Sequence, residues 1–263
     1  MSTTVVEVPR KRRRGRRALI AIIAIVVLLI VAFFVADYYA KKYATGYVQQ
    51  QVATALDLSS TAPVDVNLGS GSILLQAATG QIDDVTVTVN PLVIDGYTGS
   101  ATLTAEGVPL SSTTPVRDLH VSVDIPEATI TKAIATVPAL ARYDPKVTIA
   151  RDRVAVNGTV SVFGFDQSVG VTLKPQVNAG EPSLTILTAQ FDGATVSIPQ
   201  LDNYIPGLSD ALQSGTSLCI ANALPKAFVL TGISLKGQSL VSTFTGNGVE
   251  LNSASLAQKG TCG

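Results

Sequence analysis

One uninterrupted apolar run, Ala18–Ala36, constrains this chain more than any other feature of its sequence. Its nineteen residues carry no charge, no proline and no side-chain amide. As an α-helix the run rises about 28 Å, which is close to the roughly 30 Å hydrocarbon core of a bilayer. We therefore predict an uncleaved transmembrane anchor over residues 18–36.

The charges that flank this run predict its orientation. Seven basic residues precede it: Arg10, Lys11, Arg12, Arg13, Arg14, Arg16 and Arg17. Asp37, Lys41 and Lys42 follow it. Because positive charge is retained on the cytoplasmic side, residues 1–17 are expected to form a basic cytoplasmic tail. The protein would then cross the cell membrane once, as a signal anchor, with everything after Asp37 outside the cytoplasm.

Two other interpretations of the run stay open. A secretory signal peptide has an apolar region of about 7 to 15 residues and a small-x-small cleavage site. Here the run is longer, and Phe34, Asp37 and Tyr38 stand where small residues would be needed. A buried core helix fits less well, because one flank is strongly polar and the run lacks a polar stripe.

The formal net charge of zero conceals two unlike parts. The tail has seven basic residues and one acid, Glu7, whereas the rest of the chain has twelve basic and eighteen acidic residues. An acidic exported domain is a poor candidate for nucleic-acid binding. For the tail we expect a topology signal with some attraction to anionic lipid, and a cytoplasmic partner stays open.

Both cysteines, Cys219 and Cys262, fall in the exported part, where the compartment permits a disulfide. We predict that they pair and join the C-terminal tail to the segment around Leu218. Closing a loop of 42 intervening residues contributes on the order of 2 to 4 kcal/mol to stability. A zinc or redox site would need further ligands or a CxxC spacing.

The residues after the anchor favour a continuing juxtamembrane helix, 37–58, that packs on an exported domain of residues 59–263. Its apolar and aromatic residues recur at spacings of three and four: Tyr39, Tyr43, Tyr47, Val48, Val52, Ala55 and Leu56. Tyr38 and Tyr39 are placed for the headgroup region, where an aromatic ring with a polar tip is favoured. Tyr43 and Tyr47 are expected to pack on the domain.

From Ala62 onward the hydrophobic pattern has a period of two, which is typical of strands in an antiparallel sheet with one covered face. The alternating sets are Val64–Leu68, Val85–Val89, Ala101–Ala105, Leu119–Ile125, Ala227–Leu235 and Leu240–Thr245. These sets predict most of the sheet.

The pair Asn157-Gly158 resembles a hairpin turn, but the alternating valines on either side keep their parity through it. We therefore predict one long strand from Arg153 to Phe163, with Gly158 on its inner face and a turn at Gly164. Long strands with an interior glycine suit a strongly curved sheet.

Two helical segments interrupt the strands, so the pattern as a whole predicts an α+β fold. Pro126 and Glu127 suit the first turn of a helix that ends near Pro138. A second segment, 199–224, contains Pro206-Gly207, where we expect a kink or a new helix start. The apolar stripes of the two helices are Ile130, Ile134 and Val137, and Leu201, Ile205, Leu208 and Leu212.

The sequence offers little for catalysis or metal binding. Its one histidine, His120, shares strand parity with acidic and hydroxyl residues and is expected on the polar face. We find no GxSxG nucleophile elbow and no metal-ligand cluster, and we predict a non-enzyme without a cofactor. A lipid hydrolase would need a triad assembled from residues distant in sequence. Gly69–Ser72 lacks a following GK[ST] and a helix, so we expect a loop between strands.

What remains is an excess of aliphatic residues. A plain hydrophobic core accounts for most of it. Alternatively, part of the apolar stripes faces a cleft between sheet and helices that is wide enough for acyl chains. For a domain tethered a few residues from a bilayer, lipid would be the nearest abundant ligand.

The order of segments resembles a known family. It is carried by the anchor, the juxtamembrane helix ending in ATALDL, the IPEATITKAIA helix, the VAVNGTVSVFGF strand pair, the IPQLDNYIPGLSDAL stretch and the closing FTGNGVEL. Over residues 40–255 this layout is similar to the actinobacterial exported phospholipid-binding family typified by the mycobacterial lipomannan elongation factor. The resemblance implies a phospholipid-binding envelope protein with a tubular lipid-binding-like fold, in which a curved antiparallel sheet wraps on a long helix.

Our hypothesis is therefore a membrane-anchored, extracytoplasmic phospholipid-binding protein that supports envelope lipid or lipoglycan assembly. The helical stripes Ile130, Ile134 and Val137, and Leu201, Ile205, Leu208 and Leu212, would form the walls of an apolar groove. Lys132 and Arg142 are candidates for a phosphate contact. The competing hypothesis is a non-catalytic envelope scaffold with a solid core that docks another envelope protein.

Overall fold

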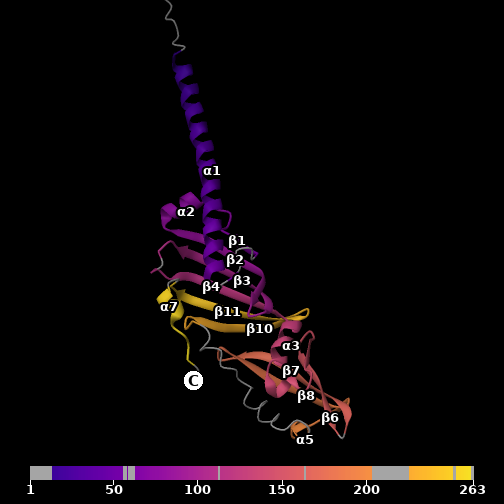
Figure 1. The fold of residues 1–263 in the computed structure, drawn as a ribbon. Coiled ribbons are helices and arrows are strands. Elements are labelled where there is room, and N and C mark those ends of the chain that lie inside the picture. Colours follow the sequence, from indigo (N-terminus) through magenta and orange to yellow (C-terminus); the bar gives the residue numbers. More distant parts are fainter. Residues whose placement is uncertain are drawn as a thin grey trace, which may run out of the picture.

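The computed structural model describes residues 14–55, 58, 63–111, 113–162, 164–202, 225–250 and 253–261. It is an α+β protein with antiparallel sheets and a long N-terminal helix, as the hydrophobic pattern predicts (Figure 1). The helices are α1 (Arg14–Ala55), α2 (Ile73–Thr79), α3 (Glu127–Ala135), α4 (Pro138–Ala141), α5 (Ile198–Asp202) and α7 (Ser253–Ala257).

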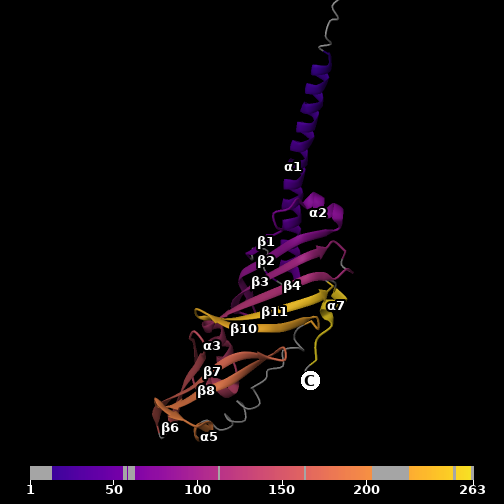
Figure 2. The ribbon, with the colours of Figure 1, turned by 180° about the vertical axis from the view of Figure 1, so that it is seen from behind.

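The described strands form two sheets. Sheet A has six strands in the order β1 (Val64–Asn67), β2 (Gln81–Ile94), β3 (Tyr97–Pro109), β4 (Val116–Pro126), β11 (Ser239–Val249) and β10 (Phe228–Lys236). Sheet B has five, in the order β5 (Lys146–Ile149), β6 (Val154–Val162), β7 (Phe165–Asn178), β8 (Glu181–Phe191) and β9 (Ala194–Val196). The sheets follow one another along an elongated body, with sheet A nearer to α1 in both views (Figures 1 and 2).

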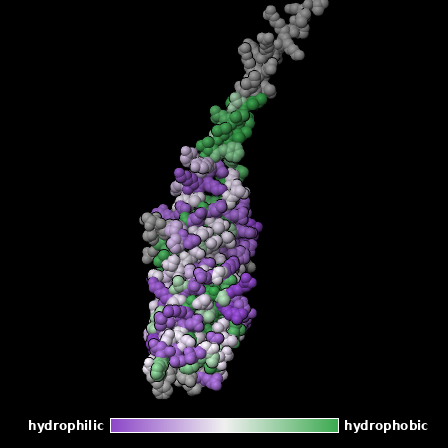
Figure 3. All heavy atoms as spheres, turned by 90° about the vertical axis from the view of Figure 1, so that its right-hand side faces the viewer, coloured by the Kyte–Doolittle hydropathy of each residue, from purple (hydrophilic) through white to green (hydrophobic). Residues whose placement is uncertain are grey.

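Helix α1 has an outer, apolar part that projects away from the body and an inner part that packs on it. The apolar side chains from Ile23 to Val35 are mostly exposed, and the helix is long and apolar enough to cross a membrane. Figure 3 shows this part as an apolar rod above a mostly polar and mixed surface. The inner part contributes Ala40, Ala44, Val48 and Val52 to a core cluster built on β1, β2 and α2.

The predicted packing of two tyrosines of this helix differs from the structure. Tyr43 is 78% exposed and Tyr47 is also exposed, so neither packs on the domain. The small and β-branched residues on an adjacent face of the helix pack there instead, because they let the helix backbone approach the sheet closely. In addition α1 contacts β1 and α2 at one edge of sheet A. Wrapping of the sheet around this helix therefore stays an expectation from the resemblance.

A short helix follows the GSGS segment, where we expected only a loop between strands. Ser72 caps α2, because its hydroxyl accepts a hydrogen bond from the Leu75 N–H (3.3 Å), and Gly80 ends the helix in a left-handed conformation with φ of 80°. Residues Ile73 and Gln76 of α2 are buried. Gly69–Ser72 is therefore irregular, as expected, but it leads into a helix and not directly into the next strand.

Helix α3 joins the two sheets. Its Ile130 and Ile134 pack on a core cluster that holds Val147, Ile149 and Val154 of sheet B and touches Leu235 and Leu240 of sheet A. Its polar side chains protect the edge strand β5, since Thr131 Oγ1 and Glu127 Oε2 accept hydrogen bonds from successive outward N–H groups, of Val147 and Ile149, at 2.9 Å.

The prediction of one long strand through Asn157-Gly158 is confirmed. Strand β6 passes through both residues and pairs with β7, and the chain turns at Gly164 with φ of 84°. A Cβ on Gly158 would lie 2.7 Å from the backbone oxygen of Tyr143, which accepts a hydrogen bond from the Thr159 N–H. Glycine is needed at this position because the Tyr143 backbone crosses directly over the strand.

Candidate functional site

The apolar face of sheet A is covered unevenly. Toward β1 and β2, a core cluster that includes the inner part of α1 buries Val66, Leu68, Val85 and Val87. Toward α3, a second cluster contacts Leu235 and Leu240. A third cluster closes one end of the strands with Ala105, Val116, Leu119 and Val249. Between these clusters the same face carries large side chains that are only partly buried.

We call this region the central apolar face. Its residues are Leu103, Val121, Val123, Ile233 and Phe244, all partly exposed. The sheet register places them side by side: Leu103 pairs with Val121, Val121 with Phe244, and Ser242 pairs with both Val123 and Ile233. Because alternate residues share one face of a strand, these five side chains lie on one face of the sheet, with Ser242 between Val123 and Ile233.

The register neighbours of this face differ sharply from it in burial. Leu230, directly opposite Phe244, is 3% exposed, and Leu119, two residues before Val121, is fully buried. An aliphatic surface that stays partly open beside a closed core is suited to an apolar ligand.

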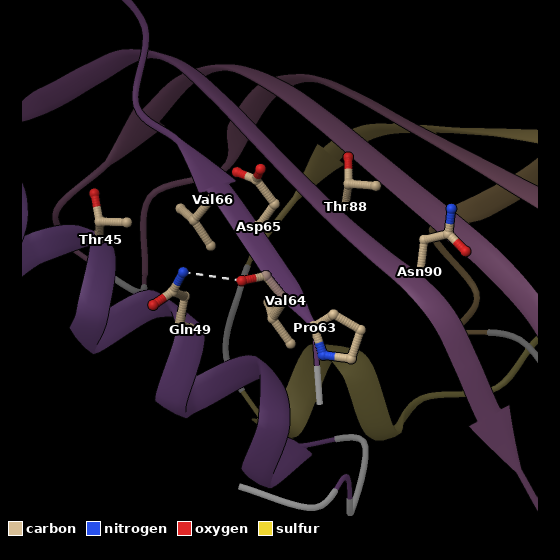
Figure 4. A pocket seen from close by; sticks show the side chains of 8 residues that line it. All are labelled: Thr45, Gln49, Pro63, Val64, Asp65, Val66, Thr88 and Asn90. Carbon is tan, nitrogen blue, oxygen red and sulfur yellow. Dashed lines mark hydrogen bonds between the residues drawn. The ribbon is translucent and has the colours of Figure 1, made fainter. Parts of the chain in front are cut away.

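A separate cleft of about 600 Å³ lies between α1 and the β1 edge of sheet A (Figure 4). Thr45 and Gln49 line it from α1, and Asp65, Thr88 and Asn90 line it from the strands. The Gln49 amide reaches across and donates a hydrogen bond to the Val64 carbonyl at 2.9 Å. The lining residues include one carboxylate and no cation, so this cleft is unfavourable for a phosphate group.

Comparison with known proteins identifies the family. A family model described as LmeA-like phospholipid-binding matches residues 35–245. The chain belongs to this family. Searches of curated proteins and of solved structures found no match.

The extent of the match agrees with the packing of α1. It begins at Val35, next to the end of the predicted anchor, and ends at Thr245 in β11. The LmeA-like region therefore includes the inner part of α1, which the structure packs into the core of sheet A. It also includes all five residues of the central apolar face.

The predicted wall residues occupy different environments in this LmeA-like chain. Ile130 and Ile134 pack over the cluster between the sheets. Val137 lies between α3 and α4, outside both helices, and is 43% exposed. Leu201 belongs to α5, but nothing is described of its side chain. Ile205, Leu208, Leu212, Cys219 and Cys262 lie outside the described residues, so their predicted roles stay predictions.

The two candidate phosphate ligands already have partners. Lys132 donates a hydrogen bond to the Gly96 carbonyl at 2.7 Å, and its ammonium lies 5.5 Å from the Tyr97 ring centroid. The Arg142 guanidinium stacks over the Tyr143 ring at 4.8 Å. The Lys132 contacts attach α3 to the turn between β2 and β3, whereas the Arg142 contact is local, with the next residue in the chain.

His120 lies on the exposed face of β4, opposite the central apolar face, as its parity predicts. Thr104 and Thr245 flank it in the register. Within the part of the chain that the structure describes, no group of three or more His, Cys, Asp or Glu side chains could hold a metal ion.

Sequence reasoning identified the strands of the central apolar face but did not assign a ligand to them. The useful signal was the run of valine and leucine at one parity in β3 and β4. It needed the pairing of β4 with β11, more than 100 residues later in the chain, to become a surface.

Proposed function

We propose that this protein holds phospholipid acyl chains against the central apolar face, outside the cytoplasm, while α1 anchors it in the cell membrane. The observation that carries the proposal is the partial exposure of Val121, Val123 and Phe244 beside the closed core residue Leu230. Membership of the LmeA-like phospholipid-binding family supports lipid as the ligand.

Such binding would be driven by the burial of apolar surface and would involve no covalent step. Burying apolar surface contributes about 25 cal/mol per Å², or about 0.8 kcal/mol for each CH₂ group of an acyl chain. If each side chain of the face covers a few methylene groups of the acyl chain, the summed free energy is sufficient for useful affinity. The protein would act as a non-catalytic binder in envelope lipid or lipoglycan assembly, with a tubular lipid-binding-like arrangement of its sheets.

Two features support anchoring. The predicted anchor and the inner part of α1 that packs on sheet A belong to one unbroken helix, so the anchor is joined to the domain without a linker. The exposed apolar side chains from Ile23 to Val35 need a nonpolar environment, and the basic tail before them favours a cytoplasmic N-terminus.

Site-specific photocrosslinking in living cells tests the proposal directly. The photoreactive residue p-benzoylphenylalanine replaces Phe244, which it resembles in shape, in the full-length protein. After irradiation and purification, mass spectrometry of the peptide from β11 should show an adduct with the mass of a phospholipid. The matched control places the same residue at His120, which lies on the opposite face of the same sheet.

A phospholipid adduct at Phe244 and none at His120 supports the proposed site. Equal adducts at both positions indicate nonspecific contact with the membrane, which contradicts the proposal. An adduct between Phe244 and another protein would instead favour the scaffold hypothesis.

A further inference from the structure

Helix α2 is attached to α1 at the point where α1 leaves the predicted anchor. Asp37 Oδ1 accepts hydrogen bonds from the Ser72 hydroxyl (2.7 Å) and from the Leu74 N–H (3.0 Å). One helical turn further along α1, the Lys41 ammonium donates a hydrogen bond to the Gly69 carbonyl. These contacts hold the first turn of α2 at the level of Asp37.

That level corresponds to the headgroup region if residues 18–36 span the bilayer. The headgroup regions extend a bilayer from about 30 Å to about 40–45 Å, which leaves about 5–7 Å on each side. Asp37 is the first residue beyond the predicted span. Figures 1 and 2 show α2 as the part of the domain closest to the projecting end of α1.

The outward side of α2 is apolar. Leu75 is 60% exposed, and the helix residues ILLQAAT include no charged side chain. Leu110 lies beside the end of α2, where its N–H donates a hydrogen bond to the Gly80 carbonyl at 3.0 Å, and it is 56% exposed. One exposed leucine on an uncharged helix and a second beside its end are disfavoured in water but favoured at a membrane interface.

Two aromatic residues of α1 also indicate that this part of the protein lies at the membrane surface. Tyr38 and Tyr39 are both exposed on α1 next to Asp37. Tyrosine is enriched where a membrane meets water, because its ring is apolar and its hydroxyl is polar. Leu75 and the two tyrosines therefore occur near the level of Asp37, and Leu110 lies beside the C-terminal end of the same short helix.

We propose that Leu75 and Leu110 form a membrane-seating surface that inserts into the outer leaflet of the same bilayer that α1 crosses. The Asp37 contacts with Ser72 and Leu74 hold this surface at the correct depth. The domain then rests on the membrane at a fixed height and tilt. This inference depends on the proposed anchoring but not on lipid binding at the central apolar face.

Tryptophan fluorescence can test the seating surface because the chain contains no tryptophan. The full-length variants Leu75→Trp and Leu110→Trp are reconstituted in phosphatidylcholine–phosphatidylglycerol vesicles, with and without phosphatidylcholine brominated near the top of its acyl chains. The bromines quench only nearby indoles. Leu187→Trp, on an exposed position of β8 in sheet B, is the matched control.

Both seating variants should lose about half of their fluorescence in brominated vesicles, since interfacial helices bury their apolar face about 5–10 Å into this boundary. The Leu187→Trp control should be unchanged. Absence of quenching at Leu75 and Leu110 would overturn the proposal. A blue-shifted but unquenched Leu75→Trp would also overturn it, because protein rather than lipid would then cover the surface.

A variant within the anchor separates failure of the seating from failure of the anchoring. Phe34→Trp should be quenched whenever α1 lies in the bilayer. Quenching at Phe34 without quenching at Leu75 refutes the seating surface alone, whereas no quenching at either residue refutes the anchoring on which it rests.

The role of Asp37 is tested in the Leu75→Trp background. Asp37→Ala removes the acceptor and should abolish most of the quenching at Leu75, while Asp37→Asn keeps an acceptor oxygen and should retain it. Unchanged quenching in Asp37→Ala would show that the Asp37 contacts do not position α2.

Discussion

Two residues that face each other in the sheet register should respond differently to truncation if the central apolar face binds lipid. Phe244 and Leu230 are paired on neighbouring strands β11 and β10. Leu230 is 3% exposed and belongs to the closed core, whereas Phe244 is only partly buried. The variants Leu230→Ala and Phe244→Ala therefore compare a core position with a proposed ligand position at nearly the same place.

The expected magnitudes follow from burial. Leu230→Ala leaves a cavity in a closed core and should lower the free energy of unfolding by about 2 to 5 kcal/mol. Phe244→Ala should cost clearly less than the about 3 to 5 kcal/mol typical of a fully buried phenylalanine, because its ring is partly open in the lipid-free protein. Loss of the ring's contact with an acyl chain should weaken lipid binding by about 1.5 to 3 kcal/mol, or about 10- to 150-fold.

The measurement uses the fragment Asp37–Gly263, which retains the part of α1 that packs on sheet A. Urea unfolding followed by circular dichroism gives the stability of each variant, and titration with a fluorescent phospholipid gives its affinity. We expect Leu230→Ala to lose mainly stability and Phe244→Ala to lose mainly affinity. If Phe244→Ala loses as much stability as Leu230→Ala and keeps its lipid affinity, Phe244 is a core residue and the reasoning is refuted.

Three further predictions concern stability and covalent structure. Gly158→Ala should destabilise the protein by about 1 to 3 kcal/mol, because the new methyl group would clash with the backbone oxygen of Tyr143. Gly46→Ala has open space around its Cβ and should stabilise α1 by about 0.5 to 1 kcal/mol. Urea unfolding measures both changes. Hydrogen bonds from the Leu74 N–H and the Ser72 hydroxyl hold the pKa of Asp37 below its ordinary value of 3.8. The stability that ionised Asp37 contributes is therefore present at neutral pH and is lost as the pH falls through the lowered pKa. Asp37→Asn should flatten the loss of stability measured between about pH 5 and about pH 3. Cys219 and Cys262 should resist alkylation in the oxidised protein and gain two alkyl groups after reduction, and alkylation without reductant, followed by mass spectrometry, would contradict the pairing.

The strands could be predicted from the sequence because their information is local. At Asn157-Gly158, a pair typical of turns, the alternation of apolar and polar residues continues without a change of parity. This parity alone distinguished one continuous strand from a hairpin. The division into two sheets was not predicted, since it depends on β4 pairing with β11 rather than with β5. Strand order of this kind is decided by contacts between distant segments.

Helix α2 shows why a short helix escapes sequence analysis. Its seven residues are too few to be stable alone. The acceptor that fixes its first turn is Asp37, which lies 35 residues before Ser72. The local sequence around Gly69–Ser72 therefore looks like a loop, and the cap that Ser72 provides is reinforced by the tertiary contact with Asp37.

The described wall residues that the sequence predicted and the partly open surface of sheet A lie on different elements. Helical stripes such as Ile130 and Ile134 have the same periodicity whether they line a groove or fill a core, and the structure packs both on the cluster between the sheets. The partly open surface lies on β4 and β11 instead, around Val121 and Phe244. Periodicity reports which face of an element is apolar, but the element that covers this face is set by the tertiary fold.

The continuity of α1 limits where lipid can be exchanged. The inner part of α1, from Asp37 to Ala55, rises about 28 Å and packs on the core of sheet A through Ala44, Val48 and Val52. An anchor joined in this way has no slack, so on the proposed topology the central apolar face moves only laterally with the membrane. A lipid held on this face would therefore stay near the membrane, and its delivery to another site in the envelope would need a partner that comes to the protein.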